Sequence, residues 1–282
     1  AGDAPAMTPS GADFANIKFR FSIGKYHEQS FYEPNSIFVD RVNDEIYVVD
    51  TGKSEILILE TNGTPIFKFG KRDGLDTPID LVVRGSRIYV SQENKPFIEI
   101  FSLRGEPMGK IFPEGVEFSP GRMDIDEQGN IYVVNRKDSA CLVIDKEDRF
   151  VRTIGEGLES LVAVAAGRGR VYLITPFASK MMAVHVYGAD GTHEASFEAA
   201  EGKGGTLGLP TAGKVDAQGN LWLVDAQKGI IVFDRNLNEV FRLEFLIKPE
   251  FSLLNFPTDI DFDGKGMVYI MEKGAKVVSV LK

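Results

Sequence analysis

Short apolar runs of four to six residues alternate with turn residues along almost the whole chain. A typical stretch is "DEIYVVDTGKSEILILETNGTPIFKFG", residues 44–70, in which three apolar runs are separated by Asp, Asn and Gly. Runs of this length, rich in Val, Ile, Tyr and Phe and bounded by turn residues, predict β-strands joined by hairpins. No segment has the periodicity of a long amphipathic helix, so we predict an antiparallel all-β fold.

This set of runs repeats six times. Each repeat carries an aromatic residue in its second run, and successive aromatic residues are 40 to 50 residues apart. These residues are Tyr47, Tyr89, Tyr132, Tyr172, Trp222 and Tyr269. In five repeats a proline opens the first run, and Ser160 takes its place in the fourth. Six repeats of four short strands, here named a to d, predict a six-bladed β-propeller.

The two ends of the chain complement each other. The last repeat has strands a, b and c but no strand d before the chain ends at Lys282. The segment "ANIKFRFSIG", residues 15–24, resembles a strand d and has no strands a to c before it. We therefore predict that residues 14–24 pair with residues 277–281, because this closure removes exposed sheet edges. Residues 14–282 would form one propeller domain, and residues 1–13 a flexible N-terminal segment.

The repeat pattern Pro-x-x-apolar-x-Asp…Gly-x-apolar-Tyr-Val-x-Asp resembles the NHL-repeat family of six-bladed propellers. The match is best in Pro34–Leu59 and Pro210–Phe233. In that family the b–c loops and the d–a connections lie on one face, around a channel lined by strand a. The resemblance implies this arrangement here, and it fixes the fold better than the function, because propellers serve many unrelated functions.

The net charge, the cysteine count and the length of the apolar runs argue against several classes of protein. The net charge is −9, whereas nucleic-acid binding usually needs a basic face, so nucleic acid is an unlikely partner. One cysteine, Cys141, excludes an intrachain disulfide. No apolar run approaches the roughly 20 residues that span a bilayer, so we expect no membrane insertion. The start, "AGDAPAMTPSGADF", is typical of an exported protein after signal-peptide removal. We predict a periplasmic or extracellular location, with membrane association through a removed or missing N-terminal segment left open.

Each b–c loop carries a lysine, which predicts a basic ring on one face of an acidic protein. Such a ring would attract a protein partner or an anionic small molecule. The residues of this predicted binding face are Lys53, Lys95, Arg136, Lys137, Phe177, Lys180, Met181, Lys228 and Lys273. Phe177 and Met181 would supply apolar contact. The sequence thus favours a non-catalytic binding or scaffolding propeller that uses no cofactor.

The alternative is a metal-dependent hydrolase or lactonase of the gluconolactonase-like propeller type. The residues predicted at the channel mouth are Asp50, Asp80, Arg122, Asn135, Asp225 and Asp259. Asp80 and Asp259 are the candidate ligands of a divalent cation such as calcium, which prefers oxygen ligands. Arg122 would repel a cation if its side chain pointed inward.

The histidines do not predict a zinc site. The only three, His27, His185 and His193, lie in different parts of their repeats, so we do not expect all three to meet at one metal.

Overall fold

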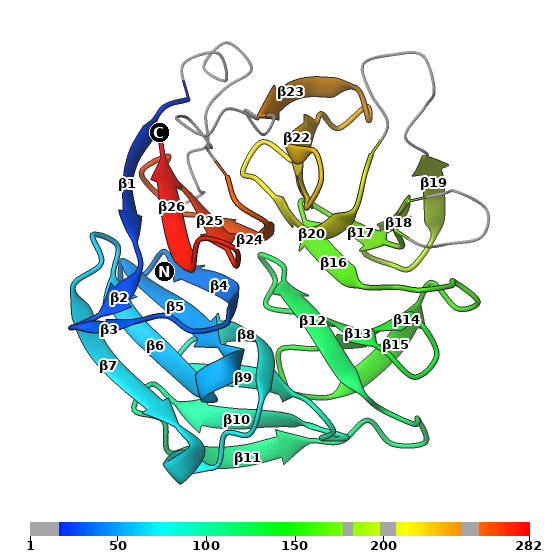
Figure 1. Cartoon of the computed structure of the whole chain (residues 1–282). Coiled ribbons are helices and arrows are strands. Elements are labelled where there is room, and N and C mark those ends of the chain that lie inside the picture. The colour runs from blue at the N-terminus through cyan, green and yellow to red at the C-terminus, as the bar shows by residue number, and fades with distance from the viewer. Residues whose placement is uncertain (1–16, 177–182, 198–206, 244–253) are drawn as a thin grey trace.

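Six four-stranded antiparallel sheets surround a central axis like the blades of a propeller (Figure 1). The structure is a computed structural model that describes residues 17–176, 183–197, 207–243 and 254–282. The predicted all-β, six-bladed architecture is confirmed. No helix in the described part of the chain is long and apolar enough to cross a membrane.

Each blade contains four strands that follow the predicted order from the axis outward. Blade 1 consists of β4 (Pro34–Asp40), β5 (Glu45–Asp50), β6 (Glu55–Glu60) and β7 (Pro65–Gly70). Blade 2 consists of β8 (Pro78–Arg84), β9 (Arg87–Gln92), β10 (Ile98–Ser102) and β11 (Pro107–Ile111). Blade 3 consists of β12 (Pro120–Ile125), β13 (Ile131–Asn135), β14 (Ala140–Ile144) and β15 (Phe150–Ile154).

The second half of the ring repeats this order. Blade 4 consists of β16 (Ala163–Gly167), β17 (Arg170–Ile174), β18 (Val184–Gly188) and β19 (His193–Phe197). Blade 5 consists of β20 (Pro210–Val215), β21 (Leu221–Asp225), β22 (Gly229–Phe233) and β23 (Glu239–Leu243). Blade 6 consists of β24 (Pro257–Phe262), β25 (Val268–Glu272), β26 (Val277–Leu281) and β1 (Phe19–Ile23). Short elements in the connections are β2 (Lys25–Tyr26), β3 (Gln29–Ser30), and the 3₁₀-helices η2 (Thr51–Lys53) and η3 (Lys71–Asp73).

The ring closes through the N-terminal strand. β1 pairs antiparallel with β26, with Ile23 opposite Val278 and Phe21 opposite Val280. Beyond the strand ends, residues 18 and 282 exchange two backbone hydrogen bonds of 2.9 Å. The predicted closure is therefore confirmed. The predicted flexible segment, residues 1–13, lies outside the described residues.

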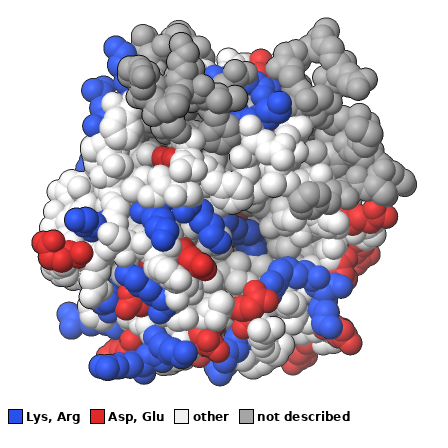
Figure 2. All heavy atoms as spheres, in the orientation of Figure 1, with Lys and Arg blue, Asp and Glu red and all other residues white. Residues whose placement is uncertain are grey.

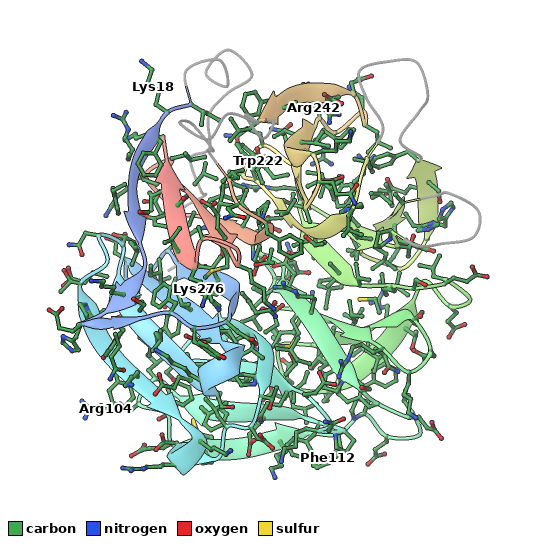
Figure 3. The ribbon with its side chains drawn as sticks, viewed as in Figure 1. Lys18, Arg104, Phe112, Trp222, Arg242 and Lys276 are labelled. Atoms are coloured by element: carbon green, nitrogen blue, oxygen red, sulfur yellow. The ribbon has the colours of Figure 1, made fainter. Side chains whose placement is uncertain are left out.

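The repeated aromatic residues fill the space between blades. All six are at most 1% exposed. Trp222 is labelled in Figure 3. Its ring meets that of Phe262 in the next blade, with ring centroids 5.1 Å apart. Its indole nitrogen donates to Asp216 at 2.9 Å, and the same carboxylate accepts the Asn220 backbone N–H at 2.8 Å. The turn between strands a and b thus satisfies the one polar atom that the buried Trp222 side chain carries.

We predict that the closing strand contributes strongly to stability. Ile23 is 5% exposed and belongs to the apolar cluster between blades 6 and 1, so Ile23→Ala should lower the free energy of unfolding by about 3 kcal/mol. Ser22→Ala, in the same strand but exposed, is the matched control and should stay within about 0.5 kcal/mol of wild type. Equal effects of the two variants in denaturant unfolding would contradict this packing.

Candidate functional site

The b–c loops and the d–a connections lie at the same end of the propeller, which we call the mouth face. In five blades the first residue after strand b donates its backbone N–H to the carbonyl oxygen of the residue just before strand a of the same blade. These hydrogen bonds are Thr51 to Glu33, Glu93 to Thr77, Arg136 to Ser119, Ala226 to Leu209 and Lys273 to Phe256, at 2.8–3.1 Å. The predicted loop residues of these five blades therefore belong to one face of the molecule.

Carboxylates on strand a join neighbouring blades across the channel wall. Each accepts a backbone N–H from strand a of the following blade. The pairs are Asp80 with Met123 at 2.8 Å, Asp124 with Ala166 at 2.8 Å, Asp259 with Ile37 at 3.0 Å and Asp261 with Val39 at 2.8 Å. These side chains line the channel because they hold the ring together, which is a sufficient structural reason for their presence.

Asp80 is a buried carboxylate of the channel wall, 4% exposed. Its carboxylate also accepts a hydrogen bond from the Ser36 hydroxyl and one from its neighbour Leu81 at 2.8 Å. Burial raises the pKa of Asp80 to about 6, Arg122 opposes this shift, and the nearby Asp259 charge adds to it. The sequence placed Asp80 near the channel, and the structure adds that its oxygen atoms already have partners.

Arg122 points inward and pairs with Asp259. Its Nη1 lies 3.1 Å from an Asp259 carboxylate oxygen, and its Nη2 donates to the carbonyl oxygens of Asn35 and Thr258 at 3.0 Å each. Only 13% of either side chain of the pair is exposed. A positive charge that the chain itself supplies therefore occupies the place where a bound cation would stand.

A second buried cation lies deeper in the channel. Lys214 Nζ lies 2.6 Å from Asp124, 3.6 Å from Asp261 and 5.4 Å from the Phe38 ring centroid. Burial lowers the pKa of Lys214, but the two carboxylates outweigh burial and raise the pKa above its ordinary value. Sequence reasoning missed Lys214, although a lysine in the channel-lining strand of its repeat is the signal that would have found it.

These paired charges leave little open space. The cavity lined by Asp80, Arg122, Asp124, Lys214 and Asp259 has a volume of about 20 Å³. A volume of this size holds about one water molecule. Among the described residues, no group of three or more His, Cys, Asp and Glu side chains converges as metal ligands would. The residues present therefore do not fit the calcium site that the gluconolactonase-like alternative implies.

The predicted residues at the ends of strand b anchor the loops. The carboxylate of Asp50 accepts the backbone N–H groups of Tyr32 and Glu33 at 2.7 and 3.0 Å. Asp225 does the same for residues 208 and 209. Asn135 accepts from the residue 119 amide at 2.9 Å and donates to the residue 117 carbonyl. Each side chain thus fixes the incoming d–a connection to the start of a b–c loop.

Several of the predicted loop cations are engaged within the chain. Lys53 Nζ donates to the Ser30 carbonyl at 2.6 Å, Arg136 pairs with Glu93 at 2.9 Å, and Lys137 lies 3.6 Å from Glu117. Figure 2 shows basic and acidic side chains interspersed over the lower half of this face. The predicted residues Phe177, Lys180 and Met181 lie outside the described residues.

The remaining predicted lysines are less neutralised. No described carboxylate lies within 4.0 Å of the ammonium groups of Lys95, Lys228 or Lys273. Lys228 and Lys273 are exposed, whereas Lys95 is half-buried. Among the five b–c loops whose lysines the structure describes, two therefore present an exposed lysine without a described ion pair.

Two exposed aromatic residues lie beside the loop that carries Lys273 and Lys276. Tyr32 is 53% and Phe256 47% exposed, and both belong to d–a connections of the mouth face. The Phe256 carbonyl accepts the Lys273 backbone N–H at 3.0 Å. Lys276, which is labelled in Figure 3, has its Nζ 5.1 Å from the Tyr32 ring centroid. We call Tyr32, Phe256, Lys273 and Lys276 the aromatic–lysine patch. The sequence prediction assigned one lysine to each loop and therefore missed Lys276, although the loop sequence "EKGAK", residues 272–276, contains a second lysine.

Comparison with known proteins defines the fold more clearly than the family. The chain matches no protein-family model and no curated protein in sequence. The structure of a gluconolactonase from Xanthomonas campestris superposes with a TM-score of 0.70 at 14% identity, covering 99% of this chain and 94% of that one. The resemblance to NHL repeats stays a prediction.

Two further solved structures are similar in extent. A luciferin-regenerating enzyme gives a TM-score of 0.66 at 14% identity, covering 93% of this chain and 94% of the enzyme. Virginiamycin B lyase from Staphylococcus aureus gives 0.63 at 12% identity, covering 94% and 99%. All three neighbours are enzymes built on this propeller fold, and identities this low establish a shared fold only.

We predict that Asp80 titrates well above an ordinary aspartate. Its pKa of about 6 exceeds the ordinary 3.8, so protonation favours the folded state. This contribution to stability is complete below pH 4 and is lost as pH rises through about 6. The ¹³C resonance of its carboxyl group should titrate near pH 6. The unfolding free energy of wild type should also fall relative to Asp80→Asn between pH 4 and 7. A midpoint near pH 4 would contradict the described burial.

Proposed function

We propose that this protein is a non-catalytic binding propeller whose mouth face docks an acidic surface of a partner protein. The observation that carries the proposal is the aromatic–lysine patch, which combines exposed rings with exposed cations at one place. Aromatic residues are enriched in the buried cores of protein interfaces, and rim lysines steer a partner of opposite charge. The role requires no cofactor.

The filled channel supports a binding role over a catalytic one. Arg122 and Lys214 neutralise the channel carboxylates, and the cavity between them has room for about one water molecule. A substrate inside the channel would have to displace these ion pairs, and breaking a buried pair is strongly unfavourable. The mouth face is accordingly where we place the partner.

The patch also refines the predicted lysine ring. Lys53, Arg136 and Lys137 already have partners within the chain, so they add less to the field that an incoming partner meets. Lys273 and Lys276 share one loop, and the acidic residue of that loop, Glu272, is 3% exposed. We therefore assign the strongest steering to the sector formed by blades 5, 6 and 1, with Lys228 at its border.

We also infer that the blades are NHL-type repeats of an exported protein. The support is the repeated opening proline, the b-strand aromatic residue and the b-strand Asp in blades 1 and 5. The composition of residues 1–13 supports export. Binding and scaffolding suit such a module, because the loops vary freely while the blades keep the fold.

We predict that charge reversal in the patch weakens binding to acidic ligands. Fluorescence anisotropy with a labelled poly-glutamate peptide should show binding that weakens as salt concentration rises. Lys273→Glu and Lys276→Glu should each reduce affinity about 5-fold, corresponding to about 1 kcal/mol per charge. Lys146→Glu makes the same charge change in a turn of the opposite face and should have little effect. Equal losses in all three variants would contradict a localised patch, and competition by inorganic phosphate would indicate a small anion as the ligand.

A metal-dependent hydrolase or lactonase is the second candidate. The observation in its favour is that the similar solved structures include a gluconolactonase, a luciferin-regenerating enzyme and a lyase. Asp80 and Asp259 do reach the channel, as that reading requires. Against it, Asp259 pairs with Arg122, and Asp80 accepts from Ser36, Leu81 and Met123.

We predict that gluconolactone hydrolysis by the purified protein does not depend on Asp259. The turnover measured with CaCl₂ should equal the turnover measured with EDTA. Asp259→Asn should change neither value, because the Asp259 carboxylate already forms an ion pair with Arg122. Calcium-dependent turnover that disappears in Asp259→Asn would establish the second candidate instead. Circular dichroism of the variant serves as the control for folding.

A further inference from the structure

Two of the three histidines converge on a serine in the outer half of blade 4. Ser196 Oγ lies 2.8 Å from His185 Nδ1 and 2.8 Å from His193 Nε2. His185 belongs to β18, and the other two residues belong to β19. Sequence reasoning treated the histidines as separate, whereas the structure brings this pair together around one oxygen atom.

A β-bulge explains the convergence. His185 stands opposite Ser196, and Tyr187 stands opposite His193, because the register shifts between Val186 and Tyr187. In a regular strand, His193 and Ser196 would face opposite sides of the sheet, since they are three positions apart. The extra residue of the bulge turns His193 to the face that already carries His185 and Ser196.

The ring of His185 is held from its other side. His185 is 9% exposed. Its Nε2 lies 3.1 Å from the hydroxyl oxygen of Thr175, the residue that follows β17. In the tautomer that donates from Nε2 to Thr175, the lone pair of Nδ1 points at Ser196. Metal-binding histidines usually have their second nitrogen fixed by such a hydrogen bond.

In the absence of a metal, the Ser196 hydroxyl can bridge the two rings by donating its proton to His185 Nδ1 and accepting the N–H of His193 Nε2. A divalent ion would replace this bridge. A metal ion accepts both lone pairs at once. At metal–nitrogen distances of about 2.0–2.1 Å, a tetrahedral ion needs the two nitrogens roughly 3.4 Å apart. Both nitrogens lie 2.8 Å from Ser196 Oγ, so both rings are directed toward the same point. His193 is exposed, which gives an ion access from solvent.

The side chains around Ser196 indicate which metal ions this site would bind. Glu194 is paired with Arg170 at 2.8 Å, and the Tyr187 ring contacts His193 with centroids 5.1 Å apart. The convergent donors are thus two imidazoles and a hydroxyl. Imidazole ligands select Zn²⁺, Cu²⁺ and Ni²⁺ over Ca²⁺ and Mg²⁺, which prefer oxygen.

We propose that His185 Nδ1 and His193 Nε2 form a binding site for a divalent transition metal, with Cu²⁺ bound most tightly and Zn²⁺ next. Ser196 Oγ lies within reach as a third ligand, and water completes the coordination. The bound ion would link β18 to β19 and so stabilise the outer hairpin of blade 4. This site is independent of the channel and of the proposed partner surface.

The test uses the full-length protein without an affinity tag, freed of metal with a chelator that is then removed. Isothermal titration with CuCl₂ and ZnCl₂ should give one site per chain. The EPR spectrum of the Cu²⁺ complex should show coupling to two nitrogens. CaCl₂ and MgCl₂ should give no heat from this site. Bound Zn²⁺ should also raise the melting temperature, because an ion that binds only the folded state stabilises it.

The three histidines provide matched variants. His193→Gln should weaken Zn²⁺ and Cu²⁺ binding at least about 10-fold, and Thr175→Val should weaken it about 10-fold by releasing the His185 ring. His27→Gln removes the remaining histidine, which is exposed in the β2–β3 hairpin, and should leave binding unchanged. Because His193 is exposed, its variant should fold normally, which circular dichroism checks.

Two results would overturn the proposal. One is no detectable binding by wild type at metal concentrations up to about 1 mM, which corresponds to a negligible affinity. The other is binding that His193→Gln leaves intact, or that His27→Gln removes.

Discussion

The pairing of β1 with β26 is the constraint on which the rest of this structure depends. A propeller blade needs four strands, and the last blade takes its fourth from the opposite end of the chain. Without it, β26 would present an unpaired edge, and the apolar cluster around Ile23 and Val278 would open to water. Closure also fixes the order of blades, so that loops distant in sequence share one face.

Within the closed ring, the channel is held by electrostatics of a structural kind. Carboxylates on strand a accept amides from the following blade, and Arg122 and Lys214 neutralise the negative charge that this arrangement collects. Buried charges are tolerated when they are paired and hydrogen-bonded. The same residues that resemble ligands in a sequence are therefore partners of one another here. The similar enzymes share the propeller, and the proposed preference for binding over catalysis rests in part on this pairing of channel charges.

Two surface features remain after these structural roles are assigned. On the mouth face, Tyr32 and Phe256 are exposed beside Lys273 and Lys276, a combination suited to an acidic protein surface. On blade 4, a bulge brings His193 to Ser196 and His185. Both arise from local backbone geometry laid over an otherwise regular repeat. In each case the proposed binding residues lie where the structure departs from the regular repeat.

The sequence by itself determined the all-β class, the six repeats and the closing strand, because strand periodicity and turn residues are local signals that recur with every blade. The position of Asp80 and Asp259, two residues after the proline that opens strand a, also predicted that both lie at the channel. The sequence did not determine what those carboxylates contact, since Arg122 and Met123 come from other blades. The sequence also did not predict that His185 and His193 lie close together, because a one-residue shift in register decides on which face of the sheet a side chain lies. Only the tertiary structure fixes contacts that depend on register and on neighbouring blades.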